Sequence, residues 1–246
     1  MPRGTESPST PVSCCGNGGG GEAVIDADLY IPFTGGRLTL ESGVPISFTD
    51  QTAKTTLYYT PYINDKISLY AAPDWELHTF TERSLSLAGL AANTNFDIFI
   101  YNNAGTLTLE SVAWSTDTAR ATALATQDGI YVKTGELNKR FLGTIRTTGT
   151  IGQCEDSISK RFVSNYYNEV DLSLRVIDAT DTWTYNAATW RYARAQSTNR
   201  VEYVSCISQR LVRSTVSVLA GASGAAGSVG VGIDASNANS AQIIAS

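Results

Sequence analysis

Few residues in this sequence combine a type and a spacing that would support catalysis. His78 is the single histidine, and its segment, WELHTF, holds no serine, cysteine or second histidine at the spacing of a catalytic motif. A Ser-His-Asp arrangement would have to assemble from distant positions. We therefore interpret His78 as a cross-strand or surface residue, and we predict no catalytic residues and no enzyme activity.

The positions of the carboxylates and the lack of metal-ligand spacings also indicate no catalytic site. The chain has 23 acidic residues, and a glycosidase needs only a pair of them at the right separation. Most of the available carboxylates stand beside turn residues, where they cap or bend the chain; these are Asp97, Glu110, Asp117, Asp128 and Glu136. No HxH or HExxH spacing occurs, so we predict no metal site and no cofactor.

Aromatic side chains are the strongest candidates for a binding surface. The 12 Tyr and 4 Trp residues gather in a few short segments, and alternation along a strand turns some of them outward. An outward aromatic row can bind sugar rings or another subunit, although packing in a large core accounts for most such residues. From this set we predict an exposed aromatic contact surface formed by Trp75, Trp190 and Tyr192.

The elements that must position these residues are β-strands. Apolar and polar residues alternate, or nearly so, over 56–59, 66–70, 96–101 and 107–112, and such a period is typical of antiparallel strands with one buried face. Phe96, Ile98 and Ile100 fall on one face of their strand. The turn residues Asn102–Gly105 then predict a hairpin whose loop has three to five residues and a bulge.

The rest of the chain follows the same pattern, with a few segments that favour short helices. Strands are also predicted at 130–132 and 140–146 around Thr134-Gly135, at 200–208 and at 211–219. Short helical segments are predicted at Thr81–Leu87 and at Asp117–Gln127, and a brief helix or turn at Glu155–Val163, from N-cap residues, alanines and charges that match the helix dipole. The predicted fold is therefore an all-β antiparallel sandwich with one or two short helices.

Composition divides the chain into three parts. Residues 1–22 form a Pro- and Gly-rich arm that should be flexible in water, residues 23–219 form the β-sandwich module, and residues 220–246 form an Ala- and Gly-rich segment. That last segment keeps an alternating GSVGVGID pattern, which predicts an edge strand or a subunit contact.

Charge and hydropathy exclude two classes of partner. The net charge is −5, whereas phosphate neutralisation requires clustered lysines and arginines, so we predict no nucleic-acid partner. No apolar run approaches the length of about 20 residues that a membrane helix needs, and no signal peptide is evident. We expect synthesis in a host cytoplasm, which agrees with cysteines that show no disulfide framework. Cys206, inside VEYVSCIS, is predicted to be a core residue.

Several segments together resemble a module found in virion proteins of tailed bacteriophages. They are TTLYYTPY, NFDIFIYNNAGTLTLESVAW, RATALATQDGIYVKTGE, RFLGTIRTT and KRFVSNYYN, and the resemblance as a whole runs from roughly residue 37 to residue 208. Members of this group are loosely described as tail-fibre, head-fibre or hypothetical proteins. The resemblance implies a non-enzymatic β-sandwich of jelly-roll type, trimeric and exposed on the outer surface of the virion.

Within that group, the short arm and the short C-terminal segment favour a capsid decoration (cement) protein over a host-recognition fibre. In that interpretation the arm, with Pro11, Val12, Cys14 and Cys15, docks on the major capsid protein or another virion protein. The role of the Cys14-Cys15 pair is left open. The alternatives are a tail-fibre, adaptor or receptor-binding protein, which would contact a host glycan, and a carbohydrate-binding β-sandwich.

Overall fold

The computed structural model describes residues 33–180, 184, 187, 189–207, 228–233 and 241–244. The chain divides into two compact units, Met1–Ile31 and Pro32–Ser246, and every described residue belongs to the second unit. The predicted N-terminal arm, with Pro11, Val12, Cys14 and Cys15, therefore lies outside the described residues, as does the predicted strand at 211–219.

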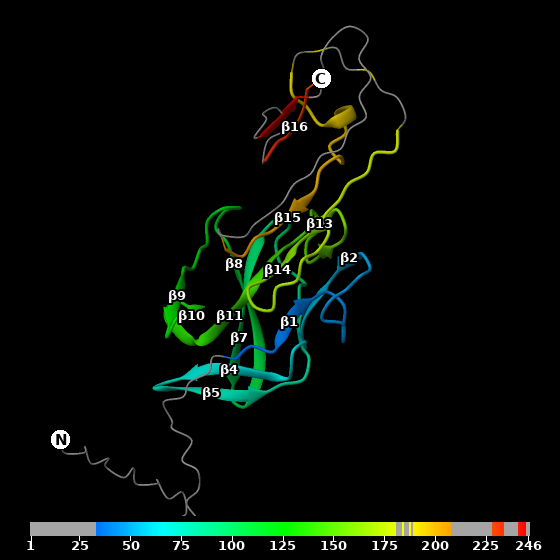
Figure 1. The fold of residues 1–246 in the computed structure, drawn as a ribbon. Helices are drawn as coiled ribbons and strands as arrows, with labels where there is room; N and C mark the ends of the chain where they lie inside the picture. Colours follow the sequence, from blue (N-terminus) through cyan, green and yellow to red (C-terminus); the bar gives the residue numbers. More distant parts are fainter. Residues whose placement is uncertain are drawn as a thin grey trace, which may run out of the picture. The chain divides into compact units, whose positions relative to one another are not determined.

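Two antiparallel sheets form the body of the described structure (Figure 1). The first has the order β1-β3-β6: β1 Gly36–Thr39, β3 Thr56–Pro61 and β6 Arg83–Ser86. The second has the order β8-β7-β11-β10-β9, with β14 also paired to β11: β7 Asn95–Asn103, β8 Thr106–Ala113, β9 Leu124–Gln127, β10 Ile130–Lys133, β11 Glu136–Arg146 and β14 Val163–Asn165. The fold is all-β and sandwich-like, as the alternation predicted.

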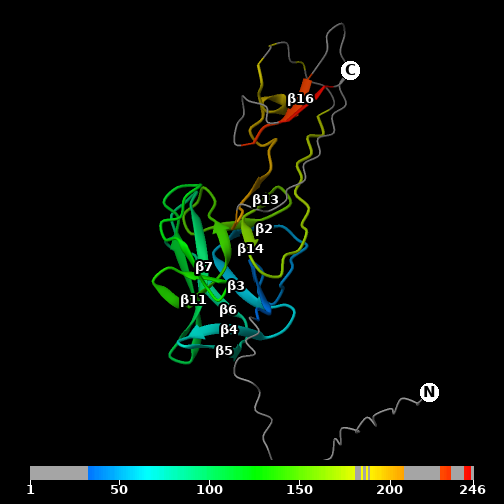
Figure 2. The same cartoon turned by 60° about the vertical axis from the view of Figure 1, so that its left-hand side comes forward.

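Three smaller sheets complete the described strands (Figure 2). One has the order β15-β13-β12-β2: β2 Gln51–Lys54, β12 Cys154–Asp156, β13 Lys160–Arg161 and β15 Glu202–Tyr203. The other two are hairpins: β4 Lys66–Ala71 with β5 Asp74–Thr79, and β16 Ser228–Val231 with β17 Ala241–Ile244. The helical structure among the described residues is one 3₁₀ turn, η1 at Ala193–Ala195.

The main core lies between the three-stranded and the six-stranded sheet. Leu38 and Leu57 enter it from the first sheet, whereas Ile98, Ile100 and Ile145 enter it from the second, and each is at most 2% exposed. Phe96, Ile98 and Ile100 belong to this one cluster, which confirms that they share a face of β7. Burying such side chains stabilises the fold by about 1.5–3 kcal/mol each.

The opposite face of the six-stranded sheet is covered as well. Phe99 of β7 and Phe141 of β11 pack there with Cys206, and all three are fully buried. Their rings lie 5.7 Å apart in a tilted arrangement that aromatic pairs favour. The prediction that Cys206 is a core residue is confirmed. Cys154, the other described cysteine, is also fully buried, and its thiol donates to the carbonyl of Arg146 at 3.1 Å.

The hairpin between β7 and β8 is tighter than predicted. Asn103 pairs directly with Thr106, so the loop has two residues rather than three to five. Ala104 and Gly105 have φ of 48° and 92°, and positive values at both central positions are the mark of a type I′ turn, whose twist matches the strands. The Asn102 side chain accepts a hydrogen bond from the amide of Gly105 at 2.7 Å.

The helices predicted at Thr81–Leu87 and Asp117–Gln127 are wrong, whereas the segment Glu155–Val163, predicted as a brief helix or a turn, contains a turn. Thr81–Leu87 contains β6, where Leu85 pairs with Leu57 of β3. Asp117–Gln127 contains a bridge between Arg120 and Trp114, and then β9. Glu155–Val163 forms the turn between β12 and β13. Propensity and capping signals amount to roughly 1 kcal/mol per position, and strand pairing onto a buried sheet outweighs them.

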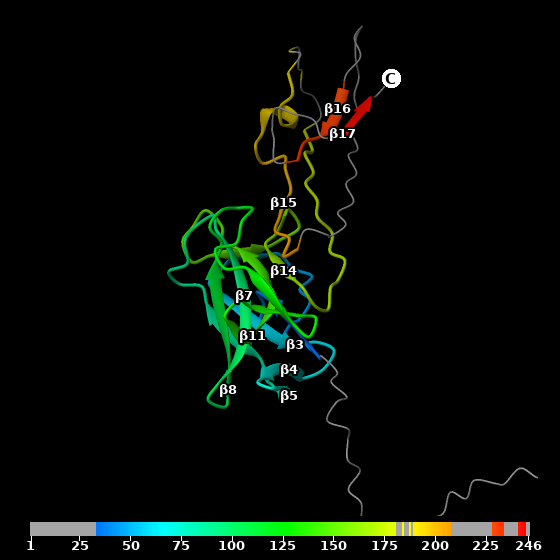
Figure 3. The same ribbon diagram turned by 90° about the vertical axis from the view of Figure 1, so that its left-hand side faces the viewer.

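Other strand predictions have mixed outcomes. The pairing of 130–132 with 140–146 is confirmed as β10–β11, and the GSVGVGID pattern forms β16, which pairs with β17 (Figure 3). The strand predicted at 200–208 is reduced to the two residues of β15. Its parallel partner β13 is equally short, which limits the ladder.

Gly143 marks the place where the central strand pair has no room for a side chain. The β7–β11 register shifts between Phe141 and Gly143, and a Cβ at Gly143 would lie 2.1 Å from the carbonyl oxygen of Ser164 on β14. We expect Gly143→Ala to lower the free energy of unfolding by about 3 kcal/mol, because backbone must move. Gly149→Ala is the matched control, since its nearest neighbour would be 3.9 Å away. Urea unfolding of both variants checks this, and equal stabilities would contradict it.

Candidate functional site: a braced contact surface

A row of polar side chains crosses the four-stranded sheet. Gln51 on β2 pairs with Asp156 on β12, Asp156 pairs with Arg161 on β13, and Arg161 pairs with Tyr203 on β15. Residues that stand directly opposite in a ladder share a face, so these four side chains lie on one side of this sheet. The row runs from the buried Gln51 to the exposed Tyr203.

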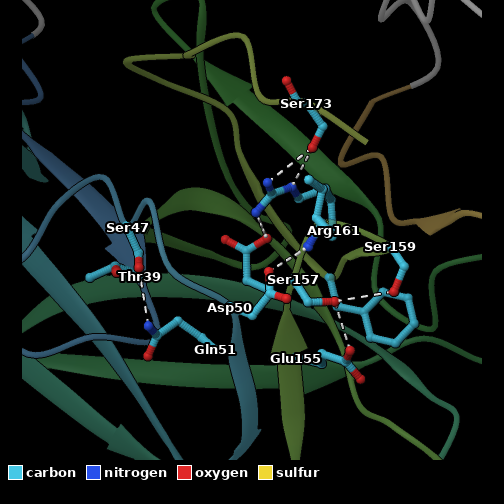
Figure 4. Close-up of polar contacts among 12 residues, drawn as sticks. Thr39, Ser47, Asp50, Gln51, Glu155, Ser157, Ser159, Arg161 and Ser173 are labelled. Atoms are coloured by element: carbon cyan, nitrogen blue, oxygen red, sulfur yellow. Dashed lines mark hydrogen bonds and ion pairs between the residues drawn. The ribbon is translucent and has the colours of Figure 1, made fainter. Parts of the chain in front are cut away.

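Arg161 is the centre of that row (Figure 4). Its guanidinium forms an ion pair with Asp156 at 3.1 Å and donates to the carbonyl of Ser173 through Nε and Nη2. Burial raises the pKa of the Asp156 carboxyl, an effect that Arg161 partly offsets. The arrangement fixes the segment around Ser173 against the sheet.

The loop between β1 and β2 is held by a second set of hydrogen bonds. The Gln51 amide nitrogen donates to Glu41 at 3.2 Å, to Ser47 Oγ at 3.1 Å and to Thr49 Oγ1 at 2.9 Å. Asp50 accepts from the amide of Ile158 at 2.8 Å, which ties the loop to the β12–β13 turn. Figure 4 shows Ser47 and Gln51 facing each other across this loop.

Glu82 braces the same loop from the other side. Its carboxylate accepts from Ser42 Oγ, from the Gly43 amide and from Thr60 Oγ1, each at 2.6 Å. Burial is the largest single influence and raises the pKa of Glu82, but the three hydrogen bonds together lower the pKa below its usual value. The ionised form of Glu82 is therefore the form that holds the loop.

Exposed apolar side chains lie on segments that adjoin this braced sheet. Phe48 is 93% exposed in the β1–β2 loop, next to the Thr49 carbonyl that accepts hydrogen bonds from the side chains of Ser47 and Gln51. Ile177, Val201 and Tyr203 are also exposed, on the segments that Arg161 and β13 hold. We call these four residues the apolar rim. Exposed apolar groups on a fixed backbone are suited to protein contact, because little conformational entropy is lost on binding.

Sequence reasoning missed the apolar rim. Phe48 lies in the segment PISFTDQT, where it follows the strand pattern of its neighbours. Its neighbours could have indicated a loop, because Ser47 before it and Thr49-Asp50 after it favour turns. An aromatic residue in such a loop is poorly placed to reach the core.

The structure places the three predicted aromatic residues in two separate parts of the fold. Trp75 lies half-buried on β5, donates its indole N–H to Asp128 at 2.9 Å and meets the Tyr70 ring edge-on. Trp190 and Tyr192 are partly exposed just before η1, where Tyr192 bonds to Arg200 at 3.4 Å. Trp75 belongs to the sandwich body rather than to the segment that carries the other two.

Trp75 also covers a buried arginine. Arg140 of β11 is 1% exposed, and its guanidinium donates to the carbonyls of Phe33 and Ser68 at 2.9 and 2.7 Å. The rings of Trp75 and Tyr167 lie 5.8 and 4.8 Å from it, within the range of cation–π attraction. Carbonyl oxygens and aromatic faces thus stabilise this charge where the β4–β5 hairpin joins the body.

His78 faces a shallow depression on the other side of β5. The depression, of about 210 Å³, is lined by polar and aromatic residues with a short apolar floor: Leu69, Tyr70, Ala71, Glu76, His78, Asn102 and Asn138. His78 Nε2 lies 3.5 Å from Glu76.

The described residues contain no group of three or more His, Cys, Asp and Glu side chains able to hold a metal ion. The described part of the chain also has no helix with the length and apolar character needed to span a bilayer. Comparison with protein-family models, with curated proteins and with solved structures found no match to this chain.

Glu82→Gln tests how the loop is held. At neutral pH the variant should unfold with a free energy lower by about 1.5 kcal/mol, because hydrogen bonds to a charged acceptor are replaced by weaker ones. The folded-state pKa of Glu82 lies below its unfolded value, so its contribution is complete above the unfolded pKa and is lost as pH falls through the folded pKa. Urea unfolding from pH 7 down to pH 3 should therefore show that the unfolding free energies of the wild type and of Glu82→Gln converge.

Asp74→Asn provides the control, since Asp74 is an exposed carboxylate on β5 and makes no hydrogen bond through its side chain in the described structure. If the unfolding free energy of Glu82→Gln stays below that of the wild type by the same amount down to pH 3, the shape of the side chain rather than its charge accounts for the difference.

Proposed function

We propose that this chain is a structural protein of a tailed-bacteriophage virion, and specifically a trimeric decoration protein on the outer surface of the capsid. It acts through contact area and transforms no substrate. The segments that resemble virion proteins lie mainly on the strands of the sandwich body, from β3 to β14.

The observation that carries this proposal is the apolar rim on a braced sheet. Phe48 is held outward on a loop whose backbone is fixed by Gln51, Glu82 and Asp50. In the isolated chain this apolar surface is exposed to water, which is unfavourable. A partner that covers the rim removes the surface from water, and this burial favours binding. A contact protein benefits from this geometry directly.

The N-terminal arm supplies the second part of the mechanism. Ordering a flexible segment costs roughly 1–2 kcal/mol per residue of backbone entropy, so apolar burial and strand addition on the partner must offset it. Three arms on one trimer rebind at high effective concentration. The major capsid protein, or another virion protein, is the proposed partner of Pro11, Val12, Cys14 and Cys15.

The second candidate is a tail-fibre, adaptor or receptor-binding protein of the same class of virion. The depression beside Tyr70 and His78 favours it, because an aromatic ring with nearby carboxylate and amide groups can bind a sugar. A carbohydrate-binding role would act through the same residues.

Copy number in purified particles separates the two locations. A decoration protein should be present in hundreds of copies per particle, because capsid surfaces repeat one site over the whole shell, whereas a tail protein should be present in a small multiple of three or six. Quantitative mass spectrometry of the particle that carries this chain gives the count. Absence from every particle would overturn both proposals.

Phe48→Ser tests the apolar rim. The variant should fold normally, because Phe48 is almost fully exposed, yet its affinity for undecorated capsids should fall at least about tenfold, since burial of a Phe side chain provides about 1.5–3 kcal/mol. Ile151→Ser is the control, being 67% exposed on a loop outside the rim. Cosedimentation with capsids measures both, and equal affinities for the two variants would contradict the assignment of the rim.

A further inference from the structure

Strand β8 ends one side of the six-stranded sheet (Figure 3). It pairs with β7 along Thr106–Ala113 without a register shift, and in the part of the chain that the structure describes no strand pairs with its other side. A long, regular edge is a template for pairing with another strand unless a lysine, a proline or a bulge disrupts it. The sequence of β8, TLTLESVA, contains no lysine or proline, and its single charged residue, Glu110, is held by Lys133 and Lys139 of its own sheet.

The hydrogen bonds to β7 show which backbone groups of β8 face outward. The Trp114 amide, directly after β8, donates to the Asn95 carbonyl of β7 at 2.8 Å. Backbone direction alternates along an antiparallel ladder, so the even-numbered residues of β8 are hydrogen-bonded to β7. The N–H and C=O groups of the odd-numbered residues face the open side: Leu107, Leu109, Ser111 and Ala113.

The far end of this open edge is closed by the chain itself. Trp114 forms an antiparallel bridge with Arg120, and the Ser115 amide donates to the Ala119 carbonyl at 2.9 Å. Ser115 faces the same way as the odd-numbered residues of β8, so the segment around Ala119 covers the open side at this end. The open edge is therefore limited to three residues, whose outward backbone groups have no partner in the described structure: Leu107, Leu109 and Ser111.

We propose that two copies of this chain pair through β8, antiparallel and centred on Leu109. In this register Leu109 stands opposite Leu109 of the second copy, and Leu107 stands opposite Ser111 at both ends. All three free residues of each edge are then hydrogen-bonded, and the two six-stranded sheets become one. The pairing is two-fold symmetric, so each edge is its own complement.

Charge and the extent of the open edge favour this register over its neighbours. Centred on Leu109, the pairing places Glu110 opposite Thr108 of the other copy, in the closely spaced position where side chains interact most. Centred on Glu110, it would place two glutamates directly opposite each other, which is destabilising. Centred on Ser111, it would need the end of the edge that the chain itself closes, and centred on Thr108 it would leave Ser111 opposite the hairpin turn.

The side chains of the open edge do not obstruct the pairing. Leu107 and Leu109 are 5% and 6% exposed, because their side chains belong to the main core. Backbone groups of fixed geometry therefore meet across the edge, and the core residues of β8 keep their packing.

Pairing of this size is weak in free solution and effective on an assembly. The paired segment, residues 106–112 of each copy, buries much less than the roughly 1,200 Å² of a stable interface. Copies held side by side on a shared surface experience a high effective concentration, which compensates for a weak contact. The inference concerns the free chain and does not depend on the proposed function.

The first experiment changes the charge opposite Glu110. Light scattering by the full chain over a concentration series up to the millimolar range should show the average mass rise toward twice that of the most dilute sample. Thr108→Lys should lower the dissociation constant and Thr108→Glu should raise it, each by about threefold or more, since two such opposed pairs form per dimer. Ile151→Lys and Ile151→Glu, on an exposed loop, make the same charge changes away from β8 and report the effect of net charge alone.

The second experiment reads the pairing residue by residue. Hydrogen exchange at high protein concentration should slow at the three amides of the open edge, whereas the amides of Thr108 and Glu110 should be protected at every concentration. A wild-type mass that does not rise, Thr108 variants that differ no more than the Ile151 variants do, or exchange that slows equally at all five amides would each overturn the proposal. In a chain that is already trimeric through another surface, the mass should rise from that of the trimer.

Discussion

The pairing of β7 with β11 is the constraint on which the rest of this structure depends. Both faces of this strand pair are covered, Ile98 and Ile145 on one side and Phe99 and Phe141 on the other. A polar residue in such a place must find its partner inside the protein. Asp97 does so by pairing with Arg120 at 2.6 Å and with Thr144 at 2.7 Å. Arg120, which lies shortly before β9, also donates to the Cys206 carbonyl. Its side chain therefore holds the segments around β9 and around Cys206 to the body.

The sequence was sufficient for the class of fold and for its most regular strands. Phe96, Ile98 and Ile100 alternate with polar or outward positions over enough residues to predict both a strand and its core-facing side. The β10–β11 pair was equally clear, because Thr134-Gly135 separates two apolar runs. Local patterns of this kind carry their information within about ten residues, which is why they are readable without a structure.

The remaining features depend on contacts between distant residues. Asp117 looks like a helix N-cap, yet in the folded chain it bonds to Arg146 on β11, and no local signal announces that partner. Trp75 appeared as an exposed aromatic, but Asp128 and Arg140 draw it against the body. The braced sheet was likewise unpredictable, because its row of side chains arises only when β2, β12, β13 and β15 meet. Sequence reasoning thus could not identify the residues that meet on this sheet.

The two described thiols have a chemical consequence of their own. Cys154 and Cys206 are both fully buried, and burial raises the pKa of Cys154 far above its usual value. Oxidants and thiol-exchange reagents react with an exposed thiolate. The raised pKa disfavours the thiolate form of Cys154, and neither thiol is exposed. Disulfide exchange or oxidation at either of these two thiols therefore requires the surrounding core to open first.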